Sequence, residues 1–216
     1  MGGGRERPVM HAEQAGSLRD GSAPGEPVDA GPRREVRLPG EMSMWVFVLG
    51  DMVIFAMYFI VYMVERSREP AVFLASQRDL NQNIGLVNTV LMLTSSWFVA
   101  RSVLAARAGK RQQTIRLVEA GGLCGVLFIL LKIYEWWSVI SHGHTVATNE
   151  FLTWYFILTG VHLIHVVVGL IILTVVLRDL RRPLPYRVSL VESGATFWHM
   201  VDLLWIVIFA LIYVMR

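Results

Sequence analysis

Charged residues are scarce in this sequence. They make up 17% of the 216 residues, and the mean hydropathy is +0.49. Because ordinary soluble domains carry about 25% charged residues, this composition argues against a soluble globular protein. The single cysteine, Cys124, excludes an internal disulfide framework. The formal net charge of +3 is small and does not indicate a nucleic-acid partner.

Long apolar runs are missing from residues 1–40. This segment holds 8 of the 18 glycines and 5 of the 8 prolines, with charges scattered between them. Such a composition cannot bury enough apolar surface to fold, so we predict a disordered tail on the cytoplasmic side. No stretch of signal-peptide type occurs in it, and we expect it to be retained.

Residues 41–216 are predicted to form one membrane domain. Its five apolar segments are residues 43–64, 83–105, 117–140, 151–177 and 194–215. A bilayer core about 30 Å thick is crossed by roughly 20 apolar residues, which must be helical to satisfy their backbone groups. The predicted fold class is therefore all-α: a polytopic membrane protein with a bundle of five transmembrane helices and a disordered N-terminal tail.

The distribution of lysine and arginine predicts the orientation. With five spans, 12 basic residues fall on the side that holds residues 33–37, 101–116 and 178–187, against 4 on the other side. The positive-inside rule therefore places the N-terminus in the cytoplasm and the C-terminus outside.

Aromatic residues cluster at the predicted outer surface. Tyr134, Trp136 and Trp137 end the third segment, and Trp154 and Tyr155 begin the fourth. Aromatic belts mark membrane–water interfaces, so we expect all five side chains in such a belt.

An acidic residue, Asp51, lies near the middle of the first segment. A charge at mid-bilayer costs about 2.5–3.5 kcal/mol, so such residues face protein or water and often have a function. Two interpretations stay open. Asp51 either exchanges protons or forms a hydrogen bond that holds two helices together.

Histidines mark the last two segments. His162 and His165 share one face of the fourth segment, and His199 and Asp202 are three residues apart in the fifth. Neutral imidazoles on two helices could ligate a haem or an iron ion. The alternative is an interhelical network of hydrogen bonds.

Two further sets of polar residues lie within the segments. Lys132 and Glu135 are three residues apart and either pair with each other or extend toward the interface. The second segment is rich in small polar residues, which favour close helix packing: Asn88, Thr89, Thr94, Ser95 and Ser96.

Five motifs carry a resemblance to a known family. They are W-V-F-V-L-G-D (45–51), N-T-V-L-M-L-T-S-S-W (88–97), K-I-Y-E-W (132–136), T-G-V-H-L-I-H-V-V-V-G (159–169) and W-H-M-V-D-L-L-W (198–205). Together they resemble subunit III of the haem-copper oxidases (the cytochrome c oxidase type) in its five-helix bacterial form. The opening stretch L-P-G-E-M-S-M-W-V-F-V-L-G-D (38–51) and the motif at 88–97 most resemble the branch associated with nitric oxide reductases. Asp51 stands where many members carry glutamate.

The resemblance implies an accessory subunit of the bacterial inner membrane with no catalytic residue, haem or metal of its own. Its expected partners are the catalytic subunit I of a haem-copper oxidase or nitric oxide reductase and membrane lipids, with phospholipid bound. Its expected roles are stability, lipid binding and proton supply. The resemblance favours His165, His199 and Asp202 as a buried network between the fourth and fifth helices. The other intramembrane polar positions are His162, Glu135 and Asp51.

Two other functions remain as alternatives. One is a stand-alone b-type cytochrome that uses the histidines of the fourth and fifth helices. The other is a small proton-coupled transporter, although transporters usually show internal repeats and broken helices. No repeat is evident, and no proline falls within the five segments.

Overall fold

The computed structural model describes residues 42–141, 143, 149–183 and 186–215. All regular structure in these residues is helical, which confirms the predicted all-α class. The prediction of a disordered tail falls on residues 1–40, which lie outside the described residues.

Five long helices and two short helical elements make up the described chain. In order they are α1 (Met42–Arg68), α2 (Pro70–Asp79), α3 (Gln82–Arg107), α4 (Arg111–Ser141), α5 (Glu150–Arg181), α6 (Val188–Phe209) and the π-helical turn η1 (Ala210–Val214). By length and composition, 5 helices can cross a membrane, with η1 continuing α6 in the last one. The predicted number of spans is confirmed, and each helix extends past the predicted span at one or both ends.

Local sequence signals account for the helix ends. The side chain of Asn81 caps α3 by accepting a hydrogen bond from the amide of Asn83 at 3.0 Å, and that of Asn149 caps α5 by accepting one from Leu152 at 2.9 Å. Gly109 adopts a positive φ of 70° in the short turn between α3 and α4. Such a turn brings α3 and α4 together as antiparallel neighbours.

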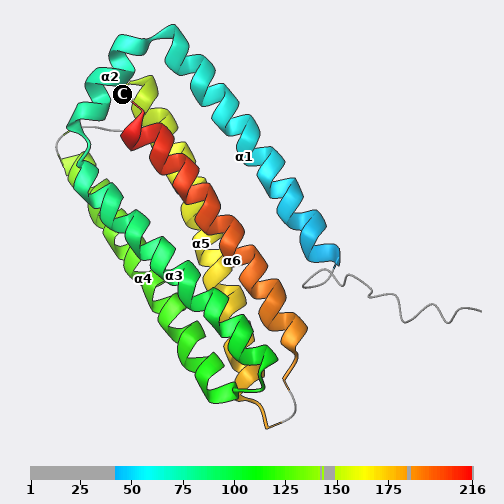
Figure 1. Ribbon diagram of the computed structural model, residues 1–216. Coiled ribbons are helices and arrows are strands. Elements are labelled where there is room, and N and C mark those ends of the chain that lie inside the picture. Colours follow the sequence, from blue (N-terminus) through cyan, green and yellow to red (C-terminus); the bar gives the residue numbers. More distant parts are fainter. Residues whose placement is uncertain (1–41, 142, 144–148, 184–185, 216) are drawn as a thin grey trace, which may run out of the picture. The chain divides into compact units, whose positions relative to one another are not determined.

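Helices α3, α4, α5 and α6 pack side by side, as Figure 1 shows. Glycines allow the close approach. A Cβ added to Gly121 of α4 would lie 2.8 Å from Val99 of α3. One added to Gly125 of α4 or Gly169 of α5 would lie 2.7 or 2.8 Å from the ring of Trp198 in α6. Trp198 therefore fills a slot that only glycines on two helices leave open.

Helix α1 packs through a narrow stripe. Its buried side chains with measured exposure, Val48, Phe55 and Tyr62, are seven residues apart, so they form one line along the helix. Phe47 stacks on Phe197 of α6 with ring centroids 6.0 Å apart. Most other side chains of α1 are exposed, and in the membrane they face lipid or another protein.

The segment between the first and second spans contains α2, a helix that the sequence analysis did not predict. Pro70 occupies its first turn, where a missing backbone N–H costs nothing. Phe73 and Gln77, one turn apart, are both buried, and Phe73 packs edge-on against Tyr62 and Phe151. This buried face is the signal that could have revealed the helix.

Candidate functional site

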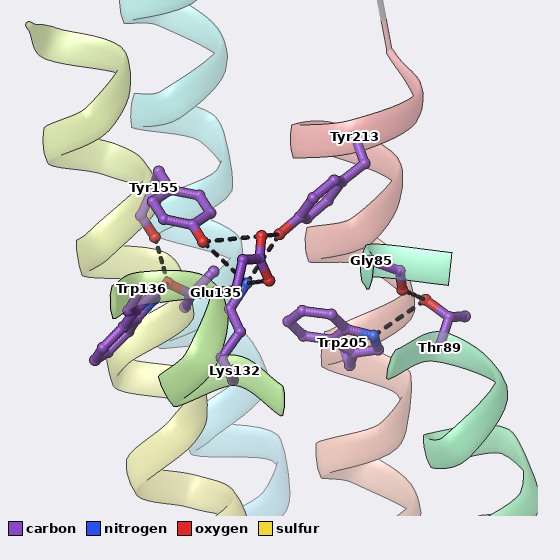
Figure 2. A network of polar contacts seen from close by, with 9 residues as sticks. Gly85, Thr89, Lys132, Glu135, Trp136, Tyr155, Trp205 and Tyr213 are labelled. Atoms are coloured by element: carbon purple, nitrogen blue, oxygen red, sulfur yellow. Dashed lines mark hydrogen bonds and ion pairs between the residues drawn. The ribbon is translucent and has the colours of Figure 1, made fainter. Parts of the chain in front are cut away.

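A buried ion pair lies where α4, α5 and η1 meet. Lys132 is 0% exposed and Glu135 is 2% exposed, and Nζ of the lysine lies 3.0 Å from Oε2 of the glutamate. Figure 2 shows the pair between two tyrosines, Tyr155 from α5 and Tyr213 from η1. The pairing of Lys132 with Glu135 is as predicted, whereas the alternative extension of Lys132 to the interface is wrong.

The two tyrosine hydroxyls complete this cluster. Lys132 donates to Tyr155 at 3.3 Å and to Tyr213 at 2.9 Å, and both hydroxyls donate to Oε1 of Glu135, Tyr155 at 3.0 Å. The lysine ammonium also lies 4.8 Å from the ring centre of Tyr155 and 5.1 Å from that of Trp205. A buried charge pair needs this many partners to offset its desolvation. We name Lys132, Glu135, Tyr155 and Tyr213 the closed cluster.

The prediction that Tyr155 lies in the aromatic belt is wrong. It is 0% exposed and belongs to the closed cluster, because its position on α5 points between α4 and η1. Tyr134 and Trp137 are 62% and 73% exposed, as a belt requires. Trp136 is partly buried and donates from its indole to Thr159 at 3.3 Å.

Two of the small polar residues of α3, Thr89 and Ser95, bind tryptophans of α6, as their predicted packing role requires, whereas Thr94 is exposed. The indole of Trp205 donates to Thr89 at 3.1 Å, and Thr89 donates to the carbonyl of Gly85 at 2.9 Å (Figure 2). The indole of Trp198 donates to Ser95 at 2.9 Å. In lipid these bonds hold α3 to α6 where hydrophobic attraction between helices is weak.

The last carbonyls of the chain's final helix are bonded by side chains from α1, α2 and α3. Tyr62 donates to the carbonyl of Leu211 at 3.2 Å, Gln77 to that of Ile212 at 3.0 Å, and Gln82 to that of Tyr213 at 3.0 Å. Helix ends leave such carbonyls without intrahelical partners. The sequence analysis missed all three donors, because only the fold brings them to residues over 130 positions away.

Asp51 and His165 meet where α1 crosses α5. Oδ2 of Asp51 lies 3.5 Å from Nε2 of His165, and their side chains are 14% and 20% exposed. Nδ1 of His165 lies 2.8 Å from the carbonyl oxygen of Val161, to which it can only donate. Phe55 packs edge-on to the imidazole with ring centres 5.1 Å apart. Oδ2 of Asp51 is buried and makes no hydrogen bond among the described residues, so the contact with His165 is an ion-pair distance only. The sequence analysis did not predict this neighbour.

His162 is enclosed in the core. It is 0% exposed, and its ring centre lies 5.6 Å from that of Phe128 and 5.2 Å from that of Trp205. Neither ring nitrogen has a hydrogen-bond partner among the described residues. His162 and His165 thus have different neighbours, aromatic rings in one case and α1 in the other.

His199 and Asp202 contact α3. Nδ1 of His199 lies 2.7 Å from Oγ of Ser96 and 4.0 Å from Oδ2 of Asp202. The predicted network that joins His165, His199 and Asp202 does not form among the described residues, because His165 faces α1 and His199 faces α3. In the part of the chain that the structure describes, no group of three His, Cys, Asp or Glu residues is placed to hold a metal ion.

Comparison with known proteins decides the family. The family described as cytochrome c oxidase subunit III matches residues 34–216. The chain belongs to this family. Cytochrome c oxidase subunit 3 of Bacillus sp. (strain PS3) is 28% identical over 212 residues, which cover 95% of this chain and 98% of that protein. The cytochrome c oxidase subunit 3 of Synechocystis is also 28% identical, over 96% of this chain and 88% of its own.

Third subunits of quinol oxidases match as well. The cytochrome bo(3) ubiquinol oxidase subunit 3 of Pseudomonas aeruginosa is 29% identical over 179 residues, or 80% of this chain and 83% of that protein. With five helices able to cross a membrane and membership of the subunit III family, the chain is a multi-pass bacterial membrane protein.

Proposed function

We propose that this protein is an accessory subunit III of a respiratory haem-copper complex, located in the inner membrane beside the catalytic subunit I. The observation that carries the proposal is the match of the subunit III family to residues 34–216, which include every helix of the structure. Relatives that match over 79% or more of this chain are named as third subunits of cytochrome c or quinol oxidases.

The placement of the histidines supports an accessory role over a stand-alone b-type cytochrome. A b-type haem held between two helices needs two imidazoles that face each other across the ring. His162 is enclosed by aromatic rings, His165 faces Asp51 and His199 faces Ser96. The three imidazoles have different surroundings and no two of them are paired to face each other across a haem, so we infer that redox chemistry resides in the partner subunit.

Proton supply to the partner is the second part of the proposal, and Asp51 with His165 supports it. Nδ1 of His165 carries a hydrogen because it donates to a carbonyl, so in the neutral ring Nε2 is an acceptor that faces a carboxyl group at 3.5 Å. We infer that this pair of titratable side chains, which joins α1 to α5, takes part in that supply.

Oxygen is the acceptor that we propose for the complex. The relatives reported above carry the names of oxidases. The second candidate, a nitric oxide reductase partner, rests on the resemblance of residues 38–51 and 88–97 to that branch. Membranes from a strain that lacks this chain should lose sustained consumption of oxygen if the first candidate is right, and of nitric oxide if the second is.

Purification of the tagged chain from its native membrane tests the accessory role. We expect a haem-containing catalytic subunit in the eluate, together with phospholipid, and a tagged chain that shows no Soret band once it is separated from that subunit. A stoichiometric Soret band in the separated chain would favour the b-type cytochrome instead.

A further inference from the structure

A histidine side chain lies partly exposed on the membrane-facing surface of α6. The side chain of His199 is 39% exposed, and Nδ1 is 2.7 Å from Ser96 of α3. Its other nitrogen, Nε2, makes no hydrogen bond within the described part of the chain. An imidazole whose second nitrogen faces hydrocarbon is costly, so this position calls for a polar neighbour from outside the chain.

His199 lies too deep in the membrane for a lipid headgroup to be this polar neighbour. At about 1.5 Å per residue, His199 lies about 17 Å along the helix from Val188 and about 22 Å from Val214. The oxygen atoms of phospholipids lie at the two membrane surfaces, whereas the hydrocarbon between them offers no hydrogen-bonding group. The neighbour must therefore be protein.

Helix α1 cannot supply this neighbour. Phe197, which stacks on Phe47 of α1, precedes His199 by two residues and so points about 200° away from it around the helix. The exposed edge of His199 faces the opposite side, together with Leu203 and Ile206, which follow it by four and seven residues. Leu203 is 47% exposed and Ile206 is 37% exposed.

A buried carboxyl group lies behind the histidine. Asp202 is 3% exposed, its Oδ2 is 4.0 Å from Nδ1 of His199, and neither of its oxygens has a hydrogen-bond partner among the described residues. Buried polar groups without partners are rare in native proteins. A polar residue of a second protein that reaches the exposed edge would bond His199, whereas Asp202 is covered by this chain itself.

We propose that the surface of α6 formed by His199, Leu203 and Ile206 is where the catalytic subunit docks, and that Nε2 of His199 hydrogen-bonds a polar side chain on one of its membrane helices. This inference rests on the proposed function, because it assigns a surface to that partner. We name these three residues the His199 surface.

Crosslinking within the assembled complex tests this assignment. The photoreactive residue p-benzoylphenylalanine is placed at Leu203 or, as a matched control, at Leu127 of α4. Leu127 is 41% exposed. It lies at the same depth, because its neighbours Gly125 and Phe128 contact Trp198 and Trp205, on either side of Leu203 in α6. We expect an adduct with the catalytic subunit from position 203 and none from position 127.

The outcomes separate this inference from the proposed function. If the unmodified chain does not copurify with a catalytic subunit, the proposed function fails. If it copurifies but the adduct forms from position 127 alone, from neither position, or between two copies of this chain, the docking surface is wrong and the function stands.

A pair of variants tests the hydrogen bond itself. Interhelical hydrogen bonds in membranes contribute modestly, so we expect His199→Leu to lower the yield of copurified catalytic subunit about 3- to 17-fold. His199→Gln keeps a polar end and should recover most of that yield. The thermal stability of the separated chain is measured in parallel. Equal yields for both variants and the wild type would overturn the role of Nε2, and so would a loss that follows chain stability alone.

Discussion

Helix α1 and the bundle of α3–α6 are held together by different means. The bundle buries an ion pair, two indole hydrogen bonds and a tryptophan wedged between glycines of two helices. Helix α1 offers one buried stripe and a few polar contacts, at Asp51 and at Tyr62. Each of these contacts joins α1 to an element of the bundle's α5–α6 side.

We infer from this difference that the bundle provides the stability of the fold, whereas α1 carries groups that contact the surroundings. Lipid gives helices little hydrophobic reason to associate, so a rigid unit needs close packing and satisfied polar groups. The closed cluster has both and is sealed from solvent, whereas Asp51 and His165 are partly exposed. We therefore expect substitutions in the bundle to lower the stability of the fold. Substitutions at Asp51 should change function more than stability.

The largest effect is expected from breaking the closed cluster. Lys132→Met leaves Glu135 buried among two tyrosines without its cation, and removal of one member of a buried pair costs about 3–5 kcal/mol. Denaturant unfolding of the detergent-solubilised chain measures the loss. Lys110→Met, at an exposed position between α3 and α4, is the control and should change stability by less than about 0.5 kcal/mol. Equal stabilities would show that the ion pair does not hold the bundle.

A methyl group added to a glycine should lower stability in the bundle and raise it in α1. Gly125→Ala forces a Cβ to within 2.7 Å of Trp198, and overpacking costs about 1–3 kcal/mol. Gly50→Ala in α1 meets no atom within 4 Å and should stabilise its helix by about 0.5–1 kcal/mol. Unfolding curves of the two variants show whether each substitution raises or lowers the free energy of unfolding. A destabilised Gly50→Ala would mean that α1 is packed as tightly as the bundle.

Loss of one hydroxyl should loosen α1 without unfolding the bundle. Tyr62→Phe removes the donor to Leu211, a bond of about 0.6 kcal/mol by the average for membrane helices. Amide hydrogen exchange should rise in α1 and stay unchanged in α4. Tyr134→Phe, whose hydroxyl is on an exposed side chain, is the matched control. A uniform rise in all helices would contradict separate attachment of α1.

The smallest effect on stability is expected at Asp51. Asp51→Asn keeps the size of the side chain and its contact with His165 but cannot titrate, so it should assemble normally. It should also shorten sustained turnover of the complex or alter its dependence on pH. Asp51→Leu should weaken attachment of α1, if the contact with His165 has a structural role. If Asp51→Asn behaves as the wild type at every pH and only Asp51→Leu fails to assemble, Asp51 has a structural role and the proposed proton role is wrong.

The helices were predictable, whereas their polar contacts were not. Hydropathy over 18 or more residues is a local property, so the five spans could be located without any knowledge of neighbours. Helix α2 was not predicted because it is short and, among its side chains whose burial is described, only Phe73 and Gln77 are buried. Tyr155 was wrongly assigned to the aromatic belt because an aromatic residue near a helix end can lie either in such a belt or in the core, and the sequence does not distinguish the two.

The sequence by itself determined the class and the number of membrane helices, since each depends on the composition of single segments, and it placed Lys132 and Glu135 within one turn of each other. Only the tertiary structure decided that Tyr213 closes the ion pair from 81 residues away, that Asp51 meets His165, and that His199 turns toward α3 instead. These choices depend on the rotation of each helix about its axis. That rotation is set by packing against its neighbours, such as Trp198 between Gly125 and Gly169.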